Sequence, residues 1–348
     1  MAEELSYQLH SEFNDKYGTI TRKIVRMLSE NSRISISDLA KNTGLSRRTV
    51  SMRLKKIEQE LGIRYTVELD YNKLGLTSPH IVFVELKEKP DYEYVEKVLK
   101  KSPIPQIAFS VKGKNAILIY GIATSTSEYV YWDNAIAVLL ARYGTLAQTS
   151  EVVHTQLGFF PLRNEMLEKS SIAPKYKEML KILNENSRVT FQELSKRLSM
   201  HFNTVAYTFN KLLKMNYIKR FTITMDKPDY VSTAAFLVKY TPKEDFEKQV
   251  LKVRRAFQSD DENTLISRYI VLAPLIGSYD HFGVGVFDDF KTATAQIAKY
   301  HKQALGNNIA YVLCYEIDKM LIGRLPLRSV DDKKDYNVID WTVGEEMK

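Results

Sequence analysis

The chain has 348 residues and a single cysteine, Cys314. One thiol excludes an intramolecular disulfide framework and a cysteine-rich zinc site, and it is typical of a reducing compartment. No apolar run approaches the ~18 residues of a membrane helix, so we expect no membrane partner. The acidic start Met1-Ala2-Glu3-Glu4 lacks the apolar segment of a signal peptide. We therefore expect a cytoplasmic protein.

Motifs of catalysis and metal binding are also missing from the sequence. There is no glycine-rich phosphate loop and no nucleophile elbow. The histidines show no metal-ligand spacing; they are His10, His80, His154, His201, His281 and His301. The sequence therefore predicts no cofactor, no metal site and no enzymatic activity.

The net charge of +8 is distributed unevenly along the chain. Residues 19–65 hold 11 Lys/Arg and 4 Asp/Glu, a net charge of +7. Residues 174–220 hold 10 and 3, which again gives +7, so the rest of the chain is acidic. Positive charge gathered on particular modules is typical of proteins that bind nucleic acid.

The most basic stretch, residues 46–57, is predicted to be an amphipathic helix. Ser46 is a good N-cap, and an apolar stripe follows at helical spacing. The members of that stripe are Val50, Leu54, Ile57 and Leu61. Arginines in the first turn of a helix that enters the major groove can reach guanine O6/N7 or phosphates. The residues expected to bind DNA are Ser46, Arg47, Arg48, Ser51, Arg53, Lys55 and Lys56. The alternative is an ordinary solvated basic face.

Two shorter apolar helices precede this stretch. Ser35 starts the second of them, and Gly44 occupies the corner, where positive φ is commonly needed. Gly62 ends the long helix, and residues 64–69 alternate like a strand that would form a wing. The pattern predicts a winged helix-turn-helix domain.

These residues resemble the Lrp/AsnC family, the leucine-responsive or feast/famine regulators. The matching positions are Asn31-Ser32-Arg33, Asp38-Leu39-Ala40, Gly44-Leu45-Ser46, Val50, Arg53-Leu54, Ile57, Leu69-Asp70 and Leu74-Gly75-Leu76. The resemblance implies a sequence-specific, DNA-binding transcriptional regulator. It also implies a ferredoxin-like domain that binds effectors and forms oligomers.

The sequence contains an internal repeat. Residues 28–34, LSENSRI, return as LNENSRV at 183–189, and residues 158–163 return at 323–328. The two offsets, 155 and 165, imply a net ten-residue insertion, which we place at the acidic stretch 258–263. A repeat of this length is a duplicated two-domain unit rather than a solenoid.

Each winged helix is followed by a β-α-β-β-α-β pattern, as in a ferredoxin-like unit. In the first copy we expect strands at 80–86, 106–111, 116–121 and 149–159, with helices at 91–101 and 126–143. In the second we expect strands at 233–240, 265–275, 281–287 and 310–320, with helices at 243–257 and 289–305. The predicted fold class is α+β, with two tandem copies of a winged helix-turn-helix domain and a ferredoxin-like domain.

The expected domain boundaries follow from these patterns. The first copy comprises an N-terminal extension at 1–18, a winged helix at 19–78 and a ferredoxin-like domain at 79–163. After a linker at 164–174, the second copy comprises a winged helix at 175–230, a ferredoxin-like domain at 231–328 and a tail at 329–348.

An effector site is implied by the resemblance, because the family carries a Gly-x-Tyr/Phe-Asp turn near bound small molecules. The matching residues are Gly277, Tyr279 and Asp280, and an amino acid or another small molecule is the expected ligand. The alternative is that Gly277 and Asp280 simply make a good hairpin turn. The first copy has Gly113-Lys114-Asn115-Ala116 at its turn and lacks the aspartate.

The two predicted recognition helices differ sharply. Phe202 and Asn203 stand where the first copy has Arg47 and Arg48, and Tyr207 replaces Met52. We therefore expect the first copy to read DNA, and the second to pack Phe202 and Tyr207 against an apolar surface of the neighbouring unit or of a partner chain. The alternative is that Asn203 and Asn210 still read adenine.

One basic recognition helix per chain suggests that two chains meet at a palindromic site, so we expect at least a homodimer. One enzyme class also resembles this layout. Siroheme decarboxylases are built from paired Lrp-like halves, sometimes fused, and only His154 and His281 would be considered for such a role. The intact basic helix at 46–57 argues against that alternative.

Overall fold

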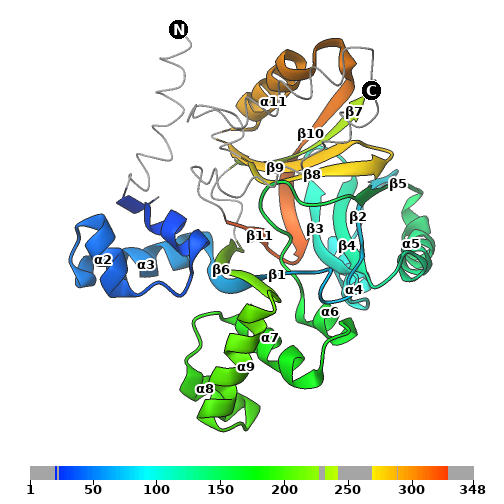
Figure 1. Cartoon of the computed structure of the whole chain (residues 1–348). Helices are drawn as coiled ribbons and strands as arrows, with labels where there is room; N and C mark the ends of the chain where they lie inside the picture. The colour runs from blue at the N-terminus through cyan, green and yellow to red at the C-terminus, as the bar shows by residue number, and fades with distance from the viewer. Residues whose placement is uncertain (1–19, 22, 227–231, 242–268, 288, 328–348) are drawn as a thin grey trace, which may run out of the picture.

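The computed structural model describes residues 20–21, 23–226, 232–241, 269–287 and 289–327 (Figure 1). Four predictions lie outside these residues. They are the N-terminal extension at 1–18, the helix at 243–257, the insertion at 258–263 and the tail at 329–348.

The first winged helix begins and ends where its capping residues predict. Helix α2 spans Ile36–Thr43 and α3 spans Arg47–Leu61. The hydroxyls of Ser35 and Ser46 accept hydrogen bonds from the first-turn amides of these helices, at 3.0 and 3.1 Å. Gly44 and Gly62 end them with φ of 71° and 60°. The apolar stripe of α3 is fully buried, as expected.

The second winged helix has the same sequence of elements. Helices α7 (Pro174–Glu185), α8 (Phe191–Leu198) and α9 (Phe202–Lys214) follow one another. Ser199 occupies the corner with φ of 52°, although it has a side chain. Val205, Phe209 and Leu212 fix α9 on the core.

A three-stranded sheet joins the two winged helices. Strand β1 (Ile63–Leu69) pairs antiparallel with β6 (Ile218–Met225), which also pairs with β11 (Leu325–Pro326). The prediction of a wing at 64–69 is therefore wrong in part: the strand exists, but it pairs with the other winged helix. Pairing with β6 satisfies backbone groups that a free edge would expose.

The other strands form one closed barrel, in the order β10-β3-β4-β2-β5-β8-β9-β7. The first half contains β2 (Ser78–Leu86), α4 (Tyr92–Lys100), β3 (Pro105–Val111), β4 (Ala116–Ala123), α5 (Thr126–Leu140) and β5 (Thr145–Val152). The second half contains β7 (Ser232–Tyr240), β8 (Tyr269–Gly277), β9 (His281–Phe287), α11 (Phe290–Leu305) and β10 (Ile309–Ile322).

The order of these elements agrees with the predicted pattern, and the strands of the two halves join into one closed barrel. Strands β5 and β8 pair at one seam, with Ser150 opposite Gly277, and β10 pairs with β3 at the other. Closure pairs edge strands that would otherwise be exposed.

Two predicted boundaries also change. The last strand of the first half was expected at 149–159, whereas β5 ends at Val152. Phe160 lies beyond it and stacks on Tyr120 with 3.7 Å between the ring centroids. The expected linker at 164–174 contains helix α6 (Asn164–Lys169), whose Met166 and Leu167 are fully buried.

One hydrophobic core runs from the winged helices into the barrel, and smaller clusters lie beneath α4 and α5 and beneath α11. In the described part of the chain, no helix is long and apolar enough to cross a membrane.

Candidate nucleic-acid interface

The exposed face of α3 begins with two arginines. Arg47 and Arg48 occupy the first turn, Lys55 lies two turns further on, and all three side chains are exposed. Among the described residues, none forms an ion pair or hydrogen bond with these three cations. The helix N-terminus adds its own partial positive charge. This end of α3 can therefore accept an anion or a base edge without breaking a described contact.

The other residues expected to bind DNA are less available. The Ser46 hydroxyl caps α3, as described above, and lies 2.9 Å from Thr49 Oγ1. Arg53 is half-buried and donates to Thr21 Oγ1 at 2.9 Å, which ties α3 to the helical segment that precedes α2. Lys56 Nζ lies 3.9 Å from Glu60 Oε1. Arg47, Arg48 and Lys55 remain the strongest candidates.

The corresponding face of α9 carries aromatics and amides. Phe202 and Tyr207 are 46% and 64% exposed, so the prediction that the neighbouring unit covers them is wrong, and cover by a partner chain stays a prediction. Phe202 makes an edge contact with Phe191, at 6.0 Å between ring centroids. Since Val205 and Phe209 already hold the opposite side of α9 on the core, this face points to solvent. Asn203 and Asn210 are exposed there as well.

The repeated motif forms a reciprocal clamp between the two winged helices. Ser32 and Ser187 share a hydroxyl–hydroxyl hydrogen bond of 2.6 Å. Arg33 donates to the carbonyl oxygens of Ser187 and Val189, the latter at 3.2 Å. Arg188 donates to the carbonyl oxygens of Ser32, at 2.5 Å, and Ile34, at 3.2 Å. The sequence showed that residues 28–34 are repeated at 183–189, but it did not predict that the two repeats contact each other.

Aromatic rings complete the clamp. The Arg33 guanidinium lies 5.2 Å from the ring centroid of Phe209 and 5.4 Å from that of Phe221, while Arg188 lies 4.2 Å from that of Tyr65. Burial lowers the pKa of Arg33, yet the carbonyl partners favour its charged form. The clamp therefore holds α3 and α9 in a fixed relation.

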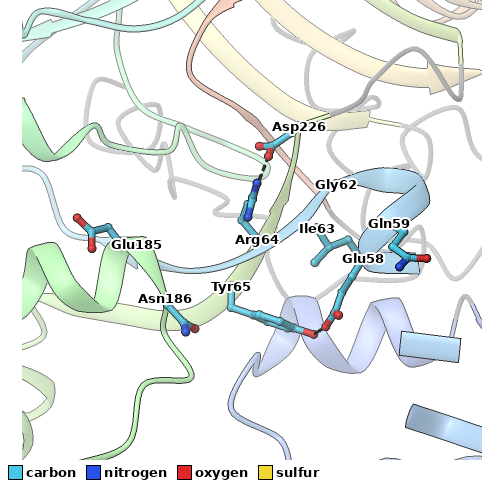
Figure 2. Close-up of a pocket in the computed structure, with 9 residues that line it drawn as sticks. All are labelled: Glu58, Gln59, Gly62, Ile63, Arg64, Tyr65, Glu185, Asn186 and Asp226. Atoms are coloured by element: carbon cyan, nitrogen blue, oxygen red, sulfur yellow. Dashed lines mark hydrogen bonds and ion pairs between the residues drawn. The ribbon is translucent and has the colours of Figure 1, made fainter. Parts of the chain in front are cut away.

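A groove of about 670 Å³ lies beside the clamp, along β1 (Figure 2). Arg64 pairs with Asp226 at 2.9 Å, and Tyr65 donates to Glu58. Burial, reinforced by the Glu58 hydrogen bond, raises the pKa of Tyr65. Since Glu58, Glu185 and Asp226 line this groove, it does not suit phosphate, and α3 remains the candidate DNA surface.

The winged helix-turn-helix DNA-binding family matches this chain twice, over residues 19–60 and 177–219. Regulatory protein AsnC of Haemophilus influenzae is 31% identical over 111 residues, which cover 32% of this chain and 74% of that protein. The chain belongs to the Lrp/AsnC family. HTH-type transcriptional regulator LrpC of Bacillus subtilis is likewise 31% identical, over 100 residues that cover 28% of this chain and 68% of LrpC.

A solved structure resembles nearly the whole of this Lrp/AsnC chain. The siroheme decarboxylase NirDL aligns with a TM-score of 0.53 at 12% identity, covering 91% of this chain and 95% of that one. At this identity the similarity shows a shared fold and no more.

The predicted effector residues of the Lrp/AsnC chain lie at the β5–β8 seam. Tyr279 is 2% exposed, donates its hydroxyl to Gln148, and its amide donates to Ser150 Oγ at 3.0 Å. Asp280 accepts from the amide of Tyr240 at 2.7 Å and from Lys239 Nζ at 3.1 Å. A Cβ on Gly277 would lie 2.8 Å from the carbonyl oxygen of Thr149. These contacts hold the seam, and an effector role stays a prediction.

Histidines gather in the second half of the Lrp/AsnC barrel. His281 bonds to the Tyr240 hydroxyl at 3.1 Å through Nδ1 and to Gln156 Oε1 at 3.0 Å through Nε2. Burial, with the nearby rings of His301 and His154, lowers the pKa of His281 to about 3. Among the described residues, no three His, Cys, Asp or Glu side chains are arranged to hold a metal ion.

Proposed function

We propose that this Lrp/AsnC chain is a sequence-specific DNA-binding transcriptional regulator, in which α3 supplies most of the affinity and the readout of guanine. The observation that carries the proposal is the exposed cationic first turn of α3, where Arg47 and Arg48 have no described partner. An arginine can bond to O6 and N7 of one guanine, and nearby lysines attract phosphates whatever the sequence. The family membership supports the same role.

A double substitution tests this proposal directly. Arg47→Ala with Arg48→Ala should weaken binding to a selected operator by at least about tenfold, since one bidentate guanine contact contributes ~1–3 kcal/mol. Fluorescence anisotropy at several salt concentrations gives both the affinity and the salt slope. The matched control is Lys299→Ala with Lys302→Ala on α11, which removes the same charge from exposed positions elsewhere. Unchanged operator affinity in the arginine variant, or an equal loss in the control, would reject α3 as the reader.

The finer architecture belongs to the same proposal. We infer that the chain is a tandem duplication in which each copy joins a winged helix to a ferredoxin-like unit, so that one chain supplies two helix-turn-helix units. The repeated motif, the two family matches and the similar element order in the barrel halves support this inference. Double-stranded DNA in the cytoplasm is the proposed partner.

An effector, if the chain binds one, is proposed to reach the seam at Gly277, Tyr279 and Asp280. The support is the resemblance of this turn to the family's ligand turn. Both carboxylate oxygens of Asp280 already accept a hydrogen bond, one from Lys239 and one from the Tyr240 amide, so an amino group would compete with these donors. Calorimetric titration with the protein amino acids, repeated on Asp280→Asn, tests this part: heats of binding that Asp280→Asn leaves unchanged would reject the site.

A second candidate function is decarboxylation of siroheme, because the whole-chain fold is similar to that of NirDL. His154 and His281 are the histidines to consider. We propose instead that the chain is not an enzyme, since α3 keeps a cationic face that decarboxylation does not require. Titration with siroheme, followed by its visible absorption bands, separates the two. Saturable spectral shifts that His281→Gln abolishes would favour the enzyme.

A further inference from the structure

The outward face of α5 is apolar. From Val130 to Leu140 the helix holds one charged residue, Asp133. Its inner side buries Tyr129, Trp132, Ile136 and Leu140 against the barrel. The large apolar side chains on its outer side are Val130, Tyr131, Val138 and Leu139, exposed by 49%, 79%, 75% and 38%. A helix that is apolar all round is usually buried on every side, so we expect another surface to pack on this face of α5.

The position of α5 in the fold does not require such a face. Helix α11 occupies the matching place in the second half, and the capping residues Ser125 and Asp289 align the two helices. In this alignment Lys299 and Lys302 stand where α5 has Ala135 and Val138, and both lysines are exposed. One barrel half therefore presents a cationic helix to water and the other an apolar one.

The apolar stripe of α5 is complementary to itself. Tyr131, Ala135, Val138 and Arg142 recur at i, i+4, i+7 and i+11, which places them along one side of the helix. If two copies of α5 cross antiparallel at Ala135, the small residue permits close approach, and Tyr131 of one copy meets Val138 of the other.

The charges at the ends of the stripe also match in this arrangement. Glu128, in the first turn of one copy, accepts hydrogen bonds from Thr124 and pairs with Lys169 at 3.5 Å, and its side chain is still 26% exposed. Arg142, just beyond α5 in the other copy, would approach this exposed part. Arg142 is already held near this face, because its guanidinium lies 4.7 Å from the ring centroid of Tyr94 and 5.0 Å from that of Tyr143. Opposite charges at the rim of an interface favour one orientation of the partners. DNA is a poor occupant, since the centre of the face has no cation.

We propose that α5 is the surface through which two copies of this chain pair into a closed two-fold dimer. An isologous contact uses the same patch on both copies, so one apolar face per chain produces a dimer and then no further growth. Lysines at the matching positions of α11 would repel one another in an equivalent contact. In the view of Figure 1, α5 lies at the right edge of the barrel, and α3 lies beside α2 on the left side of the molecule, so pairing leaves α3 open to DNA.

Sedimentation velocity on the full chain, from about 1 to 100 µM, tests the proposal, since a small interface is expected to have micromolar affinity. Wild type should pass from 40.2 kDa to twice that mass. Val138→Glu should raise the dissociation constant at least about tenfold, because it places a carboxylate against Tyr131 of the other copy in an apolar contact. Lys302→Glu, at the matching place on α11, is the control and should dimerise like wild type. Tyr131→Ser is a milder variant, and the near-ultraviolet circular dichroism of each shows that it is folded.

A mixing experiment tests the antiparallel geometry. Tyr131→Lys alone should also dissociate, whereas Val138→Glu chains mixed with Tyr131→Lys chains should recover dimers, because each substitution then faces an opposite charge. A wild-type chain that stays at 40.2 kDa throughout would overturn the proposal. So would dimers that persist in both Val138→Glu and Tyr131→Ser. Failure of mixing to restore dimers would overturn the antiparallel crossing. None of these results depends on DNA binding, so the dimer and the DNA-binding role of α3 are tested independently of each other.

Discussion

Removing Arg33 should destabilise the chain through the clamp between the winged helices. Its guanidinium donates to two carbonyl oxygens of the other copy and packs over two aromatic rings. Hydrogen bonds that involve a charged group contribute about 1.5–3 kcal/mol, and a half-exposed cation–π contact adds about 0.5–1 kcal/mol. We therefore expect Arg33→Ala to lower the free energy of unfolding by about 2–4 kcal/mol, after allowing for the solvent that screens a half-buried group.

Urea denaturation at neutral pH, followed by circular dichroism, measures this loss. Arg64→Ala is a matched control, because Arg64 also crosses from β1 to the second copy but pairs with Asp226 at 57% exposure. An exposed pair of this kind contributes less than about 1 kcal/mol. Arg33→Lys should not restore stability, since an ammonium does not reproduce the fork that reaches two carbonyl groups. If Arg33→Ala costs no more than Arg64→Ala, the clamp does not hold the winged helices together.

Three further predictions concern single side chains. The pKa of a histidine in the unfolded chain is about 6.5, whereas that of His281 in the folded chain is about 3, so between these pH values the unfolded chain binds one more proton. The free energy of unfolding should therefore fall as the pH drops through this window, by up to about 1.4 kcal/mol per pH unit. Thermal melts of His281→Gln should show a shallower pH dependence than those of the wild type. Phe202→Ala should change the free energy of unfolding by less than about 1 kcal/mol, because the ring is 46% exposed; a larger loss in thermal melts would restore the packing role that the sequence suggested. Gly277→Ala should destabilise the barrel by about 2 kcal/mol or more, since the φ of Gly277 is 135° and a Cβ would contact a carbonyl oxygen of β5. Gly113→Ala is the control: no atom lies within 4 Å of its new Cβ, so it should cost only the backbone strain of a positive φ, about 1 kcal/mol. Equal losses in chemical denaturation would refute the close approach at Gly277.

Local signals in the sequence predicted the winged helices well. Ser35, Gly44, Ser46 and Gly62 each act on a helix end a few residues away, so the boundaries of α2 and α3 follow from capping chemistry alone. The partner of β1 could not be found in this way. It lies on β6, more than 150 residues further on, and only the repeat hinted that the two copies meet.

The same distinction applies to the barrel and to the candidate site. Alternation of apolar residues located most strands, but it did not reveal that β5 and β8 join two sheets into one. Phe159 was assigned to a strand because it is apolar, yet it is buried beyond the end of β5. On α3, helical spacing identified the exposed cations. The contact between Thr21 and Arg53 depends on how the helical segment before α2 packs on α3.

Helix α3 is proposed to read DNA through its first turn. The decisive experiment is selection of bound duplexes from a randomised library, carried out in parallel with the wild-type chain and with the Arg47→Ala, Arg48→Ala variant. The wild type should enrich a motif containing guanine, and the variant should lose the preference at those base pairs while keeping weak, salt-sensitive binding. Enrichment of the same motif by both proteins, or of no motif by the wild type, would show that the first turn of α3 does not read DNA.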